Sequence, residues 1–153
     1  MEFLFLLDDT SLQELTELRL MMEPALAAKA AESANAEHIA LLRQSVLDLE
    51  RSKHDRVRLV ASDLLFHRTV FHASDNRLTG RLFQAIHRAM LNLMIVTSQL
   101  VELEHTLQFH KPIFVAIEQR NPVLASRLMA EHLNDARSLL LQSRPQWNLS
   151  PST

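Results

Sequence analysis

Four residues of this chain, Asp63, His67, His110 and His132, have the types and the spacing of a divalent-metal site. Asp63 and His67 are four residues apart, so on a helix they share one face. His110 and His132 lie eleven residues on either side of Asn121, in a segment that predicts a helix, an Asn-Pro break and a second helix. If that segment folds as an antiparallel hairpin, the two histidines lie side by side. One carboxylate and three imidazoles would then face a common point, a set that suits zinc, nickel, iron or manganese.

Each of these histidines has an alternative interpretation as a half-buried side chain bonded to a neighbouring carbonyl or carboxylate. His67, His110 and His132 have apolar sequence neighbours, however, and an unpaired imidazole is disfavoured in apolar surroundings. Taken together, the four residues favour a metal site. The pair Glu102-x-x-His105 is half of a di-iron carboxylate motif, and no second copy follows it, so that class of enzyme is not expected. The sequence also contains no glycine-rich phosphate loop and no dinucleotide-binding motif.

The elements that must position these residues are helices. The 153 residues include one glycine, Gly80, against an average share of about 7%. No Asn-Gly, Asp-Gly or Gly-Gly pair is present to close a β-hairpin, and good helix formers dominate. The predicted fold class is all-α, an antiparallel bundle of six or seven helices.

Apolar periodicity and capping residues set the expected bounds of these helices. The first helix is expected over about 11–33, with an apolar stripe and with Met21 and Met22 in the core. Asn35 and Asn121 are expected to cap the second and the last helix. Pro112 implies either the start of a new helix or a kink. The expected segments are a linker or remnant at 1–10, one domain at 11–144 whose last helix stops before Pro145, and a flexible tail at 145–153.

Composition excludes several functions and locations. The formal net charge is −2 and no basic run exceeds a residue or two, which argues against binding of a phosphate backbone by this chain alone. The chain has no cysteine, which excludes thiolate metal sites and favours the cytoplasm. Its first residues form neither a signal peptide nor a membrane span, so no membrane association is expected.

Three sequence blocks point to a family. They are residues 17–31 (ELRLMMEPALAAKAA), the run from Asp63 to His67 (DLLFH) with residues 73–76 (ASDN), and the segment from His110 (HKPIFVAI) through Asn121-Pro to His132. Together they resemble the FadR-type C-terminal domain (FCD) of GntR-family transcription regulators, over about residues 11–142. The second block is similar to the family signature D-x-x-F-H…A-S-G-N, and it departs from that signature at Asp75, where glycine is usual.

This resemblance implies an all-helical, effector-binding and dimerising domain of the metal-binding subgroup. Asp63, His67, His110 and His132 would hold a divalent transition metal, zinc or nickel in the first place, at the floor of a central pocket. A small organic acid would bind beside that metal. Arg19 matches a frequent arginine that could pair with the acid, and its alternative role is a surface salt bridge with Glu23. Two further candidates for effector contacts, Asn92 and Gln99, have solvent exposure as their default.

The resemblance also implies a homodimer that binds operator DNA through an N-terminal winged helix. No segment of this chain resembles such a domain, so DNA binding is expected only of a part outside it. The favoured hypothesis is therefore the effector-sensing domain of a transcription regulator, and not an enzyme. The first alternative is a metal-dependent, hydrolase-like enzyme acting on a small organic acid, because the proposed ligands leave coordination positions open. The second is a helical dimerisation module with structural histidines.

Overall fold

The computed structural model describes the backbone of residues 9–147 and the side chains of residues 12–143. This part of the chain forms six α-helices and contains no β-strand. The helices are α1 (Asp9–Ser33), α2 (Ala36–Ser52), α3 (Arg56–His72), α4 (Arg77–Ser98), α5 (Leu103–Glu118) and α6 (Pro122–Trp147). The predicted all-α class is confirmed, and six is one of the two helix numbers expected.

Polar caps start most of these helices at the residues that the sequence indicates. Asn35 begins α2 with a reciprocal capping box, in which its side chain accepts the His38 amide and His38 Nδ1 accepts the Asn35 amide. Asp55 and Asn76 cap α3 and α4 without a reciprocal bond: each side chain accepts one backbone amide of its helix. Asn121 Oδ1 accepts the amide of Leu124 at 3.1 Å at the start of α6. These side chains satisfy amides that have no partner within the helix.

The helix ends differ from the expected bounds in three places. α1 begins at Asp9, two residues before the expected start, and α6 continues to Trp147, so the expected stop before Pro145 is wrong. α5 runs unbroken across Pro112, so no separate helix starts there. Of the expected linker at 1–10 and tail at 145–153, residues 1–8 and 148–153 lie outside the described residues.

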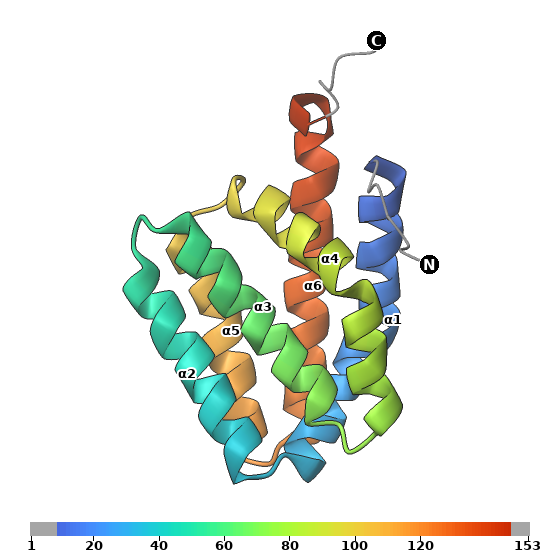
Figure 1. Cartoon of the computed structure of the whole chain (residues 1–153), viewed down its shortest axis with the longest axis vertical. Coiled ribbons are helices and arrows are strands. Elements are labelled where there is room, and N and C mark those ends of the chain that lie inside the picture. The colour runs from blue at the N-terminus through green and yellow to red at the C-terminus, as the bar shows by residue number, and fades with distance from the viewer. Residues whose placement is uncertain (1–8, 148–153) are drawn as a thin grey trace.

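The two longest helices, α1 and α6, lie side by side and run in opposite directions, as Figure 1 shows. On one side of this pair, α2 packs against α3 and α5, and α5 also packs against α6. α4 packs against α3 and crosses in front of α6 in the view of Figure 1. This arrangement makes α3, α5, α6 and α1 the helices that meet in the interior.

Buried apolar residues form two clusters. One joins the C-terminal half of α1 to α2, α3, α5 and the first half of α6, around Phe66 and Ile113. The other joins the start of α1 to α3, α4 and the later part of α6, around Phe71, Phe83 and Leu93. Burying apolar surface in these clusters is the main stabilising contribution to the fold.

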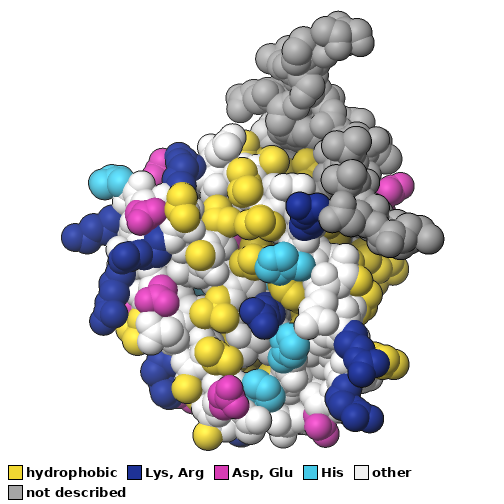
Figure 2. Space-filling view, in the orientation of Figure 1, with side chains coloured by type: hydrophobic (Ala, Val, Ile, Leu, Met, Phe, Trp, Pro, Cys, Tyr) yellow, Lys and Arg dark blue, Asp and Glu magenta, His cyan; other side chains and the backbone are white. Residues whose placement is uncertain are grey.

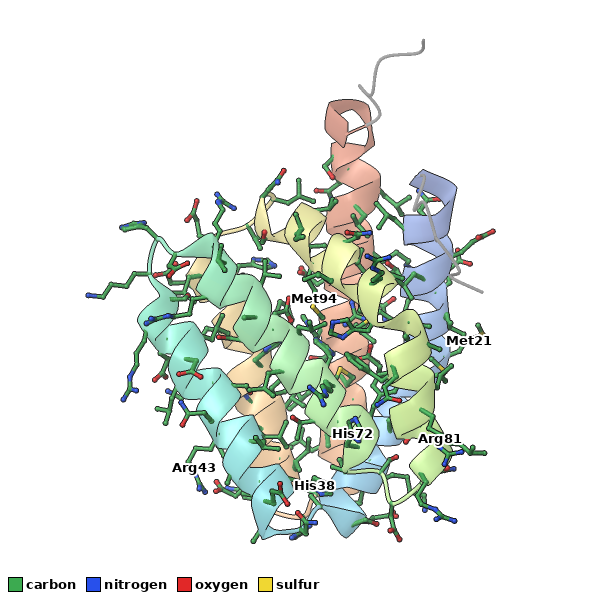
Figure 3. The ribbon with its side chains drawn as sticks, in the orientation of Figure 1. Met21, His38, Arg43, His72, Arg81 and Met94 are labelled. Atoms are coloured by element: carbon green, nitrogen blue, oxygen red, sulfur yellow. The ribbon has the colours of Figure 1, made fainter. Side chains whose placement is uncertain are left out.

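Of the two α1 methionines expected in the core, Met22 packs against it and Met21 does not. Met21, expected in the core, has 73% of its surface exposed and points away from the bundle (Figure 3). The positions that are buried instead include Leu15, Arg19, Glu23 and Ala27, which are four residues apart. Two ionisable side chains therefore lie inside the bundle on α1.

The outer surface is mixed in charge. On the face drawn in Figure 2, basic and acidic side chains are interspersed. Within the described part of the chain, none of the helices combines the length and the apolar character that crossing a lipid bilayer requires.

Candidate metal centre

Three helices bring the four predicted ligands together in the bundle interior. α3 supplies Asp63 and His67 from one face, since they are one helical turn apart. α5 and α6 form the expected antiparallel hairpin about Asn121, and it places His110 beside His132. The side chain of His67 is fully buried, that of His110 is 1% exposed and that of Asp63 is 13% exposed.

The donor atoms of these residues are close to one another. His132 Nε2 lies 3.3 Å from Nε2 of His110 and 3.3 Å from Nε2 of His67. Asp63 Oδ1 lies 3.4 Å from His67 Nε2 and 3.3 Å from His110 Nε2. Neighbouring ligands of a single ion are roughly 3.0–3.5 Å apart when the metal–ligand distances are near 2.1 Å. The three histidines can therefore hold a metal ion, and Asp63 is placed to join them.

Two of the buried polar atoms at this point have no hydrogen-bond partner among the described residues. They are Asp63 Oδ1 and His132 Nδ1. A buried carboxylate oxygen without a donor is costly, and a cation satisfies it. Three imidazole nitrogens and one carboxylate oxygen also form a donor set typical of zinc and other first-row transition metals. On both grounds the residues fit a divalent transition metal.

A buried carboxylate on α1, Glu23, orients one of these histidines. Glu23 Oε2 accepts a hydrogen bond from His67 Nδ1 at 2.5 Å, and Oε1 pairs with Arg19 Nε at 2.6 Å. A proton on Nδ1 leaves the lone pair of His67 Nε2 facing His132 and Asp63. Metal-binding histidines are commonly oriented by a carboxylate in this way. The structure thus adds Glu23 to the site as a positioning residue.

Arg19 lies inside the bundle with Glu23. Its Nη2 is 3.1 Å from Nδ1 and 3.2 Å from Nε2 of His67, so the guanidinium lies against that imidazole. The salt bridge with Glu23, which the sequence places at the surface, is in fact buried, with side chains 5% and 0% exposed. The expected salt bridge of Arg19 with Glu23 therefore forms, in the interior and not at the surface, and the same side chain borders the predicted ligands.

The charges of this cluster shift the pKa values of its acids. Burial raises the pKa of Glu23, but the charges of Arg19 and His67 outweigh burial and lower this pKa to about 2. Burial likewise raises the pKa of Asp63, and its close contact with His67 and the charge of His110 bring this pKa below the usual range. Both groups are therefore carboxylates at neutral pH, the form that binds a cation.

The histidines divide into two kinds. Burial lowers the pKa of His110 to about 3, because it outweighs the charge of Asp63, and burial also holds the pKa of His132 well below its usual value. For His67, burial lowers the pKa, but the charge of Glu23 is the main influence that raises it above its usual value. Neutral His110 and His132 offer lone pairs without first losing a proton.

A cavity of about 40 Å³ opens beside the ligands. Its lining includes Arg19, Asp63, His67 and His132 on one side and apolar residues such as Met94, which Figure 3 shows inside the bundle. His105 and Asp135 also line it, paired through Nε2 and Oδ2 at 2.6 Å. The expected partner of His105, Glu102, is exposed and precedes α5.

Two candidate effector residues are not brought to this cavity. Asn92 is exposed on α4, and Gln99 is exposed at the C-cap of the same helix. The inward positions of α4 belong to Met90, Leu93 and Met94. Neither side-chain amide lines the cavity, and both residues face solvent, which was the alternative expected for them.

Sequence comparison places this site within a known family. The family model described as the FCD domain matches residues 14–135, a range that includes Arg19, Glu23 and all four predicted ligands. The chain belongs to the FCD domain family. The resemblance to the C-terminal domain of GntR-family regulators is therefore confirmed.

Curated relatives of this FCD domain are transcription regulators. The HTH-type transcriptional repressors NanR of Salmonella newport (strain SL254) and of Salmonella typhimurium (strain LT2) are each 36% identical to it over 137 residues. Each match covers 85% of this chain and 51% of the relative. The chain thus spans about half the length of the curated relatives it matches. These relatives are not enzymes, in agreement with the prediction that this chain is not one.

Solved structures share the fold of this FCD domain. A Streptococcus agalactiae GntR chain superposes with a TM-score of 0.73 and 27% identity, over 89% of this chain and 62% of that one. Escherichia coli McbR/YncC superposes with a TM-score of 0.73 and 16% identity, over 88% and 66% of the two chains, and supports the fold alone.

Proposed function

We propose that this FCD domain is the effector-sensing part of a GntR-family transcription regulator, and that a small organic acid binds in its cavity beside a divalent transition metal. The observation that carries the proposal is the convergence of Asp63, His67, His110 and His132 beside a cavity, which is lined by Arg19 and by all of these residues except His110. Zinc and nickel are the expected ions, since both accept imidazole and carboxylate ligands.

Each charged group around the cavity would have a role in binding an acid. A bound metal supplies a positive charge and open coordination positions for a carboxylate. Arg19 supplies a second cation, buried and held in place by Glu23. A guanidinium binds a carboxylate with charge-assisted hydrogen bonds, which are about twice as strong as neutral ones. Glu23 fixes both Arg19 and His67, so the groups that receive the acid are positioned before it arrives.

The response would be passed to DNA by parts beyond this domain. We propose that the parent protein binds operator DNA through an N-terminal winged helix, pairs with a second copy and works in the cytoplasm. An acid that binds one arrangement of the bundle better than another shifts the population toward that arrangement. The shift would then alter how the two winged helices meet their operator.

The alternative of a metal-dependent hydrolase lacks a free carboxylate directly beside the predicted ligands. Metal-activated water is commonly used together with a nearby carboxylate. Glu23 is a buried carboxylate that could serve as such a base, yet its Oε1 is engaged with Arg19 and its Oε2 with His67. Asp63 belongs to the ligand set. The structure therefore offers no observation that favours an enzyme over a sensor.

Elemental analysis and thermal unfolding test the proposed function. The purified chain is expected to carry about one equivalent of zinc or nickel, and His110→Ala and His132→Ala to lose it. The exposed histidine variant His54→Ala is the control and should keep the metal. Small organic acids should raise the unfolding temperature of the metal-loaded chain, and a chelator should abolish that rise. Absence of metal from the unaltered chain, or stabilisation that survives the chelator, would contradict the proposal.

A further inference from the structure

The cavity has a second polar group, distinct from the predicted metal ligands. His105 on α5 and Asp135 on α6 line it, and each side chain is 32% exposed, whereas His67 is fully buried. The ring of Phe109 packs against both groups, with its centroid 5.6 Å from that of His105 and 5.3 Å from that of His132. The pair therefore lies toward the cavity mouth, one aromatic ring away from the ligands.

Hydrogen bonds fix the roles of these two side chains. Gln108 Nε2 donates to His105 Nδ1 at 3.3 Å, so the ring proton of His105 is on Nε2. That Nε2–H donates to Asp135 Oδ2 at 2.6 Å. Asp135 Oδ1 has no partner among the residues that the structure describes. The mouth of the cavity thus presents one carboxylate oxygen that accepts a hydrogen bond.

Two of the three hydroxyl groups that line the cavity are already engaged within their own helix. Thr97 and Ser98 also line the cavity, but their hydroxyls donate to the carbonyls of Met94 and Ile95 within α4. The remaining walls are largely apolar. A ligand that spans the cavity meets Arg19 and the metal ligands at one end and the Asp135 carboxylate at the other.

From this polarity we infer the chemical class of the effector, an inference that rests on the proposed function. The effector is a short monocarboxylic acid whose far end carries a hydroxyl or ammonium group, and Asp135 Oδ1 accepts a hydrogen bond from that group. A dicarboxylic acid is excluded, because its second carboxylate would face Asp135 in a partly desolvated site. The small cavity beside the ligands favours a short acid.

Matched pairs of acids test this inference on the zinc-loaded chain by titration calorimetry. Each pair has the same carbon number and differs at the far end, namely 3-hydroxypropionate against malonate and 4-hydroxybutyrate against succinate. 4-Aminobutyrate supplies the ammonium group, and butyrate has no far-end donor. For at least one of the two carbon numbers, the acid with a hydroxyl or ammonium group should bind at least about tenfold more tightly than the matching dicarboxylate and than butyrate. A hydrogen bond to a charged group has an effect of this size.

The variant Asp135→Asn removes the charge and keeps the shape of the side chain. In this variant the affinities for the hydroxy acid and for the dicarboxylate should lie within about threefold of each other, chiefly because the dicarboxylate binds more tightly. Glu131→Gln makes the same charge change on an exposed side chain of α6 and is the control, which should keep the full preference.

The possible results separate this inference from the proposed function. Binding of acids without preference, or a preference that Asp135→Asn leaves unchanged, overturns the assigned class and leaves the sensor intact. Failure of every acid to bind the zinc-loaded chain overturns the sensor, and the assigned class with it. A preference that disappears only in Asp135→Asn supports the inference.

Discussion

Glu23 shows how strongly one residue outside the ligand set can influence the metal centre. It is fully buried, holds the Nδ1 side of His67 and balances the charge of Arg19. Loss of its charge would leave a buried guanidinium without a counter-ion and an imidazole without its orienting partner. The first effect concerns stability, and the second concerns the metal.

Glu23→Gln should weaken zinc binding by about 10- to 100-fold, the usual effect of removing a carboxylate behind a metal-binding histidine. It should also lower the free energy of unfolding by about 3–5 kcal/mol, because a buried ion pair loses one partner. Competition with a chromophoric chelator measures the zinc affinity, and urea denaturation measures the stability.

The control for this substitution is Glu32→Gln, on the same helix, where Glu32 is exposed and pairs with Lys29. It should change stability by less than about 0.5 kcal/mol and leave zinc affinity unchanged. Equal zinc affinities of Glu23→Gln and the unaltered chain, in a folded protein, would show that Glu23 has no positioning role.

At the scale of helices, the α5–α6 hairpin sets the register of two ligands. Its turn is closed by Arg120, at a φ of 58°, and by Asn121, whose side chain caps α6. His110 and His132 meet because they are equally far from this turn. The cap affects the stability of α6, whereas the register depends on the number of residues in the turn.

Asn121→Ala should therefore lower the free energy of unfolding by about 1 kcal/mol, the typical cost of losing a cap. Asn121→Asp should keep most of that stability, since its carboxylate also accepts the Leu124 amide. Chemical denaturation of both variants measures the difference. Zinc content should be unchanged in both, and a loss of zinc in Asn121→Ala would show that the cap also controls the register.

The hairpin and the i, i+4 pair were predictable because both depend on sequence spacing. Asp63 with His67, and His110 with His132, follow from helical periodicity and from one Asn-Pro turn. The position of α1 was harder to predict. Met21 and Met22 both have core spacing in the sequence, yet Met21 is exposed and Met22 packs against the core.

Contacts between distant helices gave no comparable signal. The burial of Arg19 and Glu23 is decided by where α1 packs against α3, and polar residues at i, i+4 suggest the surface by default. The pair of His105 with Asp135 joins α5 to α6 across 30 residues. The sequence pattern relates His105 only to Glu102 and gives Asp135 no partner, so only the packed structure shows the pair.

At the scale of the whole molecule, the buried ionisable groups make stability depend on pH. The pKa of His110 is about 3 in the folded protein against 6.5 ordinarily, and the pKa of Glu23 is about 2 against 4.5. Both groups bind fewer protons when folded than when unfolded. Their contributions are therefore present above pH 6.5 and 4.5 respectively, and each is lost as the pH falls toward the folded value.

The metal-free chain should consequently lose stability as the pH is lowered from 6.5 to 4. The slope should reach up to about 1.4 kcal/mol per pH unit for each proton taken up on unfolding. The raised pKa of His67 acts oppositely, since its contribution is present below pH 6.5 and is lost as the pH rises through the folded value. Urea denaturation at a series of pH values, with a chelator present, measures the profile.

His110→Gln should flatten this profile between pH 6.5 and 4, whatever its effect on absolute stability. The exposed histidine variant His54→Gln should leave the slope as it is. An unchanged slope in His110→Gln would show that another group takes up the proton.

The residues of the site are far apart in the sequence, and this separation affects when the site forms during folding. His67 meets Glu23 across 44 residues and His132 across 65. Both contacts close long loops, and such contacts form late in folding because their entropy cost comes first. During synthesis, a chain that still lacks α6 already contains Asp63, His67 and His110, yet no complete set of ligands surrounds a common point. The full set of ligands is therefore assembled only when the last helix docks.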